Sequence, residues 1–539
     1  MDCNAPKREE VPEIKTPYAV AGSGALRAEA KFARRDLWAS WALLAAAFLF
    51  VRSLFGVFAA RATVAFAAIL IICLLYQKDA GIKAGGFGRA LAGIYGIFCL
   101  VYVYSADGFV QTLTALFLIV LGTYTVFAIC HARENAELLP QDMGSALVVL
   151  PFFGLPLGPR ALRGQRAGKR RTLIYIALGL CAAVPVTLIV AALLSSADAR
   201  FSAVVERALD SLNFGDSAEL ILQLLLAIPV GFYLFGLLYT NANGYKKEQT
   251  TAEAYALRAE RRRVLSPVFV CAALTPVLLL YLLFIGVQFD YLFSAFRGVL
   301  PVDFSYAEYA RRGFFELFAV SVINLVLLLS ASAFCKRGDG RRPAALTAYS
   351  AALTGCTLLL LATAFSKMSL YIRAYGLTRK RVLVCWFMVL LAVIFLLLLI
   401  KRFAPRFKAV SIGVTAFAAL FAILCFSQPD AVIARYNIDR FKDGTLQSVD
   451  VEALMALSDD AWVPILENYD TVAAAYNAYD GYRYFTNIGM DADVYDIADE
   501  TRSFEAVCRE KLEYYEQHPA QTFSYTGLRV KRMLQQRLA

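Results

Sequence analysis

Long apolar blocks separated by short basic breaks constrain this chain more than any other feature of its sequence. The blocks are about 20 residues long, which is the length that a helix needs to cross the roughly 30 Å hydrocarbon core of a bilayer. Of the 539 residues, 59% are hydrophobic and 18% are charged, whereas soluble domains average about 45–50% and about 25%. The pattern excludes a soluble globular protein and predicts an all-α fold, a polytopic transmembrane helical bundle.

The blocks predict about eleven spans, and any number from nine to twelve is compatible with them. The strongest is 382–400, which has no charge and in which 15 of 19 residues are Leu, Ile, Val or Phe. The first two are weakest because they contain Arg52 and Arg61, which would each cost about 2.5–3.5 kcal/mol at the bilayer centre. We therefore expect both arginines near helix ends. The predicted spans are 37–58, 60–76, 89–104, 109–130, 172–194, 217–240, 264–289, 313–334, 344–366, 382–400 and 409–427.

The distribution of basic residues predicts the orientation in the membrane. With eleven spans and a cytoplasmic N-terminus, the inner segments hold 31 Lys and Arg residues and the outer loops hold 12. Basic residues accumulate on the cytoplasmic side of membrane proteins, so this count favours a cytoplasmic N-terminus. The inner clusters near 160–171 and 258–263 could contact anionic lipid. No nucleic acid partner is expected, because these clusters lie in short loops at a membrane.

The chain divides into three predicted regions. Residues 1–36 are expected to form a flexible cytoplasmic tail, and 37–429 the transmembrane domain. The remaining 430–539 carry 19 acidic and 11 basic residues and no apolar run of membrane length. Helical spacing of their apolar residues predicts a small acidic helical domain, with Asp450 as one N-cap. With eleven spans this domain is extracytoplasmic, where it could bind a protein partner.

Two shorter segments have their own predicted roles. Residues 146–157 are apolar but contain two prolines, so they are too short and too broken to span. We expect an interfacial loop there, with a re-entrant segment as the alternative. In residues 200–212 the apolar side chains recur at helical spacing on one face and the charged side chains lie on the other. This pattern predicts an amphipathic helix in the outer interface.

Four stretches of sequence carry a resemblance to a known group of proteins. They are YAEYARRGFFELFAVSVIN at 306–324, KMSLYIRAYGLTRKR at 367–381, the segment 435–466 that opens the tail, and FSYTGLRVKRMLQQRL at 523–538. Over about residues 40–539 the chain resembles bacterial multi-pass membrane proteins of domain-of-unknown-function families 4153 and 4173. The resemblance implies a bacterial cytoplasmic membrane, many helices and a C-terminal helical region. It implies no established reaction.

Polar residues at membrane depth are the best site candidates, because burying them there is costly. Glu316 and Asn324 fall in the eighth predicted span, eight residues and about 12 Å apart near one helical face. Arg312 lies one turn before Glu316 and could pair with it, and Tyr306 and Tyr309 precede them at the outer boundary. Either Glu316 pairs with Arg312 near the headgroups while Asn324 bonds between helices, or the group lines a solute or ion pathway.

A second polar patch is predicted just beyond the ninth span, at Lys367, Arg373 and Tyr375. An anchoring belt of tyrosine and basic residues at the membrane interface explains it. No metal site or cofactor is expected. The two histidines lie far apart in the sequence, and the acidic run 491–500 does not fit a calcium-loop pattern.

No nucleotide-binding loop, zinc-protease motif, nucleophile elbow or kinase motif is present in the sequence. We therefore predict a non-enzymatic envelope protein with a scaffold, sensing or regulatory role that displays the outer helical domain. The alternative is a transporter or permease-like protein that uses the region of Glu316 and Asn324. A third possibility, an intramembrane enzyme, has no nameable nucleophile or base.

Overall fold

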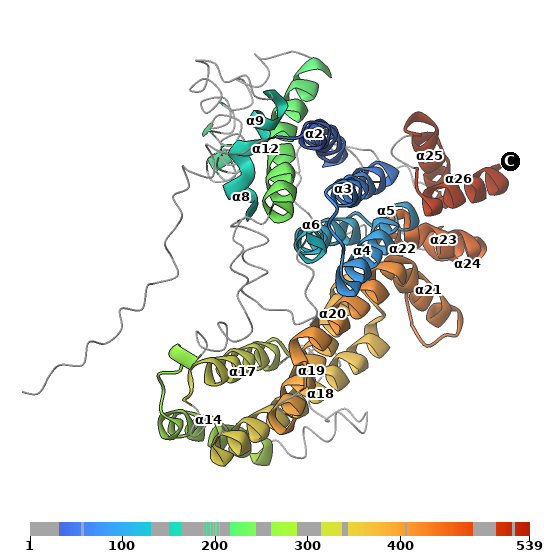
Figure 1. Ribbon diagram of the computed structural model, residues 1–539. Coiled ribbons are helices and arrows are strands. Elements are labelled where there is room, and N and C mark those ends of the chain that lie inside the picture. The colour runs from blue at the N-terminus through green and yellow to red at the C-terminus, as the bar shows by residue number, and fades with distance from the viewer. Residues whose placement is uncertain are drawn as a thin grey trace, which may run out of the picture.

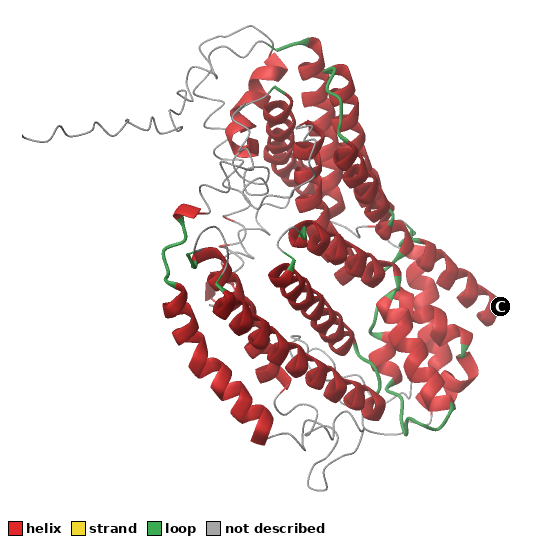
Figure 2. Cartoon of the chain, turned by 60° about the horizontal axis from the view of Figure 1, so that its bottom comes forward, coloured by secondary structure: helices red, strands yellow, loops and turns green. Residues whose placement is uncertain are grey.

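The described part of the chain is helical throughout. The computed structural model describes residues 32–54, 59–130, 150–163, 216–243, 260–287, 314–336, 343–404, 407–477, 503–519 and 523–539, with a few positions between 187 and 204. Helices joined by loops make up these ranges (Figure 2). The only β-type pairing in them is an isolated bridge between Leu265 and Cys335. The predicted all-α class is confirmed.

Ten of the described helices are long and apolar enough to cross a membrane, which confirms a multi-pass protein. The predicted span at 172–194 lies almost entirely outside the described residues. Arg52 is in the last turn of its helix and Arg61 in the first turn of the next, as expected. The ten are α2 (Arg34–Leu54), α3 (Ala59–Asp79), α4 with α5 (Gly86–Cys99 and Val101–Tyr104), α6 (Gly108–Cys130), α12 (Asp216–Ala242), α14 (Pro267–Val287), α17 (Phe314–Phe334), α18 (Ala344–Tyr375), α19 (Arg379–Phe403) and α20 (Ala409–Phe426).

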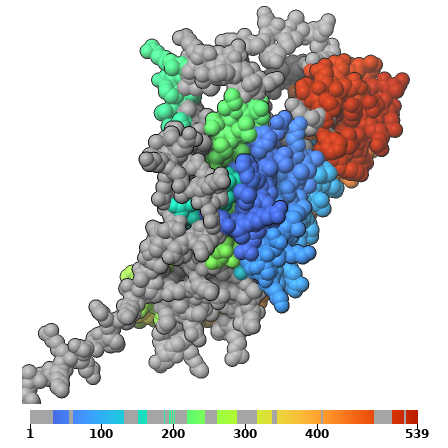
Figure 3. Space-filling view, turned by 45° about the horizontal axis from the view of Figure 1, so that its top comes forward, coloured from blue at the N-terminus to red at the C-terminus, as the bar shows by residue number. Residues whose placement is uncertain are grey.

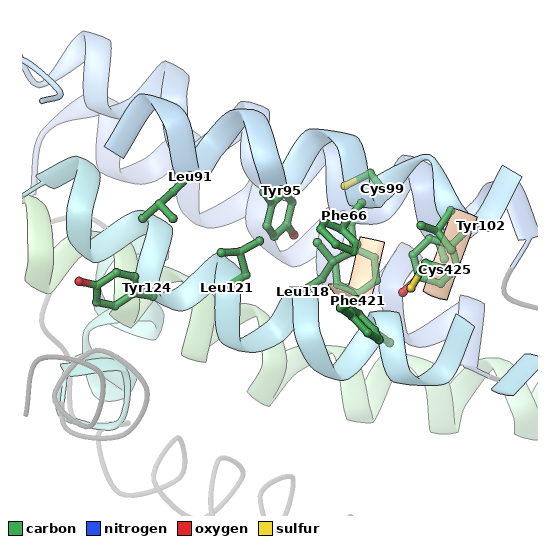
Figure 4. Packing of buried hydrophobic residues seen from close by; sticks show 14 of the residues in the cluster. Phe66, Leu91, Tyr95, Cys99, Tyr102, Leu118, Leu121, Tyr124, Phe421 and Cys425 are labelled. Carbon is green, nitrogen blue, oxygen red and sulfur yellow. The ribbon is translucent and has the colours of Figure 1, made fainter. Parts of the chain in front are cut away.

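The spanning helices form two groups that meet at α20 (Figure 1). In the first group α2 packs between α3 and α12, and α4 packs along α6; in the second, α18 packs against α14, α17 and α19. Helix α20 contacts α19 and also contributes Phe421 and Cys425 to the apolar cluster of the first group. Figure 4 shows the side chains of this cluster turned toward one another, among them Phe66 and Tyr102, whose rings stack at 5.7 Å.

Residues 150–157 differ from the predicted interfacial loop. They form helix α8 (Leu150–Gly154) and a 3₁₀ turn, η2 (Leu155–Leu157), which lead into α9 (Gly158–Arg163) and pack against α12. A Cβ atom on Gly154 would lie 2.6 Å from the Cα atom of Gly236 in α12, so only glycine allows this approach. Pro156 lies in the first turn of η2, where the missing N–H costs little.

Six helices after the last span form a unit that we call the C-terminal module. It comprises α21 (Pro429–Lys442), α22 (Val451–Met455), α23 (Asp459–Glu467), α24 (Tyr469–Asn477), α25 (Phe504–Gln517) and α26 (Tyr525–Leu538). Asp450 caps α22 by accepting from the Ala453 N–H at 2.9 Å, as predicted. Trp462, Phe504 and Leu534 are buried in the module's own apolar cluster.

The module and the start of α2 lie at opposite ends of the first group of helices. At one end the Tyr76 hydroxyl donates to Asp36 of α2 at 2.6 Å. At the other end the ring of Tyr104, the last residue of α5, stacks on Tyr525 of the module at 6.3 Å. Figure 3 shows the module projecting beside the N-terminal helices. The predicted tail and amphipathic helix lie outside the described residues, apart from a few positions.

Candidate functional site at the junction of spans and module

The predicted intramembrane group is only partly within the described residues. Arg312, Tyr306 and Tyr309 lie outside them, so the pairing of Arg312 with Glu316 stays a prediction. Glu316 is exposed in the first turn of α17, whereas Asn324 is fully buried. The structure therefore does not bring these two side chains into one cluster.

Asn324 instead connects three spanning helices. Its amide nitrogen donates to the Thr357 hydroxyl of α18 at 2.9 Å, and its amide oxygen accepts from the Tyr281 hydroxyl of α14 at 2.7 Å. Buried polar side chains in membrane helices commonly hold helices together in this way. The geometry favours the structural alternative for Asn324.

The second predicted patch lies at the end of α18, which is longer than predicted and continues to Tyr375. Lys367 is buried, at 4% exposed, while Arg373 and Tyr375 are exposed. The Arg373 carbonyl accepts a hydrogen bond from Arg440 of the module. The patch is therefore beside the surface on which the module docks.

The corner between α18 and α19 binds the module through main-chain groups. The Asn437 amide of α21 donates to the Leu377 carbonyl at 2.8 Å and accepts from the Leu377 N–H at 2.7 Å. Gly376 has φ +75°, and a Cβ atom there would lie 2.5 Å from the Asn437 amide oxygen. Glycine is needed at this position for both its conformation and its lack of a side chain.

Arg379, the first residue of α19, is the charged centre of the junction. Its guanidinium donates two hydrogen bonds to Asp430 of α21, one of them from Nε at 3.1 Å. Its Nη2 atom also lies 3.4 Å from the Asp107 carboxylate, just before α6. Both carboxylates are fully buried, at 0% and 1% exposed. One arginine thus joins α19 to the module and to the corner before α6.

A third buried carboxylate, Asp460 of α23, binds the same corner from the module side. It accepts from the Ser105 hydroxyl at 2.5 Å and from the Ala106 N–H at 3.0 Å. Asp107 accepts from the Phe109 N–H at 2.9 Å, which caps α6. The module is therefore hydrogen-bonded to two separate corners of the spanning helices.

Burial changes the acid–base properties of this cluster. Burial, reinforced by the negative charge of Asp430, raises the pKa of Asp107 to about 6, against the opposing effect of Arg379. Burial also raises the pKa of Asp460, although the hydrogen bond from Ser105 opposes the shift. Asp107 and Asp460 therefore bind protons more readily in the folded junction than exposed carboxylates do, chiefly because they are buried.

We expect the stability of the junction to fall as the pH rises from about 4 to 6. The pKa of Asp107 is higher in the folded protein than its ordinary value of 3.8, so the folded state binds the extra proton over this range. The slope is at most about 1.4 kcal/mol per pH unit. Thermal melting of the detergent-solubilised protein at several pH values measures it.

The Asp107→Asn variant should lose part of this pH dependence, because asparagine keeps an acceptor for the Phe109 N–H but does not titrate. Asp443→Asn is the matched control, since Asp443 is exposed. A native slope in Asp107→Asn would show that Asp107 does not carry the effect.

A polar cavity of about 470 Å³ adjoins the charged cluster, and its lining includes Asp107, Arg379, Asp459 and Lys511. The Lys511 ammonium lies 2.7 Å from the Asp459 carboxylate and 5.3 Å from the centre of the Trp462 ring. The cavity wall thus carries two positive and two negative groups. No group of three metal-ligating side chains occurs among the described residues.

The four junction residues Asp107, Arg379, Asp430 and Asp460 were not predicted as site residues. The available signal was their position, since each charge lies directly at the end of a helix. Charges at span ends are ordinary in membrane proteins, so position alone did not distinguish these four.

Comparison with known families places most of the chain in one of them. A family model described as a domain of unknown function (DUF4153) matches residues 91–468. The chain belongs to the DUF4153 family. The second suggested family, 4173, is not found. No curated protein and no solved structure matches. The DUF4153 match runs from α4 to the end of α23, so it includes all four junction residues.

Proposed function

We propose that this DUF4153 protein is a non-enzymatic scaffold or sensor that holds its C-terminal module in a fixed orientation on the outer face of the bacterial cytoplasmic membrane. The observation that carries the proposal is the buried network through which Arg379, Asp430 and Asp460 bond the module to two corners of the spans. A module that acted only as a tethered domain would need no such contacts. Buried ionic groups commonly specify one arrangement rather than add stability.

The proposed sidedness follows from charge and from the arrangement of the helices. Basic residues favour a cytoplasmic N-terminus, and the module lies at the end of the bundle opposite the start of α2. A phosphatase that is active only outside the cytoplasm, fused after Ala539, should be active. An inactive fusion of a membrane-inserted protein would contradict the outer location.

The role of a fixed orientation can be tested with two glycines that both have a positive φ, which strains alanine, but that differ in the space around the Cβ position. Gly376→Ala should displace Asn437 and loosen the module, because the added Cβ atom has no room. Gly444→Ala is the control: Gly444 has φ +69°, yet no atom lies within 4 Å of its Cβ position. We expect a strain with Gly376→Ala to show the phenotype of a strain lacking residues 430–539, and Gly444→Ala to resemble wild type.

Membrane insertion of both variants must be confirmed by their abundance in the membrane fraction. If the full gene deletion has a phenotype that neither Gly376→Ala nor removal of 430–539 reproduces, then the module is not the functional part. That result would favour the transporter alternative. Solute flux in proteoliposomes, compared between the native chain and Glu316→Gln, tests the alternative directly.

A further inference from the structure

An apolar groove runs along the outside of α6, α19 and α20. Its volume is about 840 Å³, and its walls are almost entirely aliphatic and aromatic. On α6 the lining extends from Phe109 to Tyr124, a distance of about 22 Å at the rise of an α-helix. One leaflet of a bilayer is about 15 Å of hydrocarbon. The groove is thus long enough to hold the acyl chains of one lipid.

The groove and the polar cavity of the junction adjoin each other. Phe109 lines both of them, because it is the second residue of α6 and lies where the span begins. The cavity is therefore at the depth of the lipid headgroups, and the groove is at the depth of the chains. Together they form one site with an apolar and a polar end.

The charges of the cavity select among headgroups. Arg379 and Lys511 can bind a phosphate, whereas Asp107 and Asp459 can accept hydrogen bonds from an ammonium group. Arg379 is paired with Asp107 and Lys511 with Asp459, so the wall has no net charge and a lipid with only negative charge gains no net attraction. A headgroup that carries one phosphate and one primary ammonium group can bind both the cations and the carboxylates of the cavity.

We propose that the groove and the cavity together bind one aminophospholipid, with its acyl chains along α6, α19 and α20 and its headgroup beneath the C-terminal module. The cavity shares Asp107 and Arg379 with the junction, but the proposal does not depend on a protein partner of the module. It would exist whether or not the module binds a protein.

The binding experiment uses the full-length purified protein after its lipids have been exchanged for detergent. Chain-labelled phosphatidylethanolamine, phosphatidylcholine and phosphatidylglycerol are titrated separately, and bound lipid is counted by native mass spectrometry. Phosphatidylethanolamine should bind about tenfold more tightly than phosphatidylcholine, which lacks the ammonium N–H donors, and than phosphatidylglycerol, which lacks the cation.

Two variants, each with a control variant, test the apolar end and the polar end of the site. Gly413 lines the groove, and a Cβ atom there would lie 3.6 Å from Leu397, an ordinary contact, so Gly413→Leu fills the groove without a clash at Cβ. Gly355→Leu is its control, because Gly355 is exposed on α18 with open space around it. Lys511→Gln removes a cavity cation, and Lys380→Gln removes an exposed one nearby.

Gly413→Leu should reduce binding of all three lipids about tenfold, whereas Lys511→Gln should reduce mainly the preference among them. Equal binding of the three lipids to the native chain would overturn the headgroup assignment. If Gly413→Leu binds lipid as tightly as Gly355→Leu does, the acyl chains do not lie in the groove. Either failure leaves the function of the module unaffected, since the strain experiments test that separately.

Discussion

Replacing Arg379 by methionine should release the C-terminal module from the spanning helices. Methionine keeps much of the apolar length of the side chain but leaves Asp430 and Asp107 buried without a cation. Removing one partner of a fully buried ion pair typically costs about 3–5 kcal/mol, because the other charge stays desolvated. The Arg379 side chain is 34% exposed, so the cost here should be smaller, because solvent screens the pair. Hydrogen exchange followed by mass spectrometry should show loss of protection in α21 and α23, while the spans stay protected.

Lys380→Met is the matched control for this variant. Lys380 follows Arg379 in α19 but is exposed, so its replacement should leave the exchange of α21 and α23 unchanged. Unaltered protection of these helices in Arg379→Met would mean that the apolar and main-chain contacts hold the module without the ionic network. In that case the fixed orientation would depend mainly on the contact between Asn437 and Leu377.

Phe504→Ala should destabilise the module itself by about 3–5 kcal/mol, the usual cost of emptying an aromatic site in a core. The Phe504 side chain is fully buried, and its ring centre lies 5.1 Å from that of Tyr469 and 5.8 Å from that of Tyr476. The cavity would lie between α24 and α25, beside the rings of Tyr469 and Tyr476. Thermal melting of the detergent-solubilised protein measures the loss.

Phe523→Ala makes the same chemical change at a position that is 53% exposed. Its effect on stability should stay within about 0.5 kcal/mol. Equal melting temperatures for Phe504→Ala and Phe523→Ala would show that the six helices have no common apolar core of their own. The module would then depend on the spans for its folding.

Hydrophobic periodicity and local capping predicted much of this fold correctly. The ten described spans lie where the apolar blocks predicted them, and Arg52 and Arg61 are near helix ends. The helical character of the segment after the last span was also predicted, and Asp450 caps α22. These features depend on residues within a few helical turns of one another, so they can be predicted from the local sequence pattern.

The group at Glu316 and Asn324 shows where local reasoning was insufficient. Eight residues on a helix turn through about 80° beyond two full turns, and α17 places Asn324 toward α14 and α18 while Glu316 is exposed. The packing of neighbouring helices decided which of the two became buried. The sequence gives the angle between Glu316 and Asn324 around the axis of α17. It does not give the positions of α14 and α18, which pack against that helix.

The sequence by itself determined that the chain is a helical membrane protein with a further helical segment after its last span, because lipid solvation and helix formation depend on composition and short-range spacing. Only the tertiary structure decided that Asp107, Arg379, Asp430 and Asp460 form one site. These residues are separated by up to 353 positions in the chain, and each alone is an ordinary charge at a helix end. The burial of the three carboxylates, and with it the raised pKa of Asp107, arises only when the module docks on the corners of the spans.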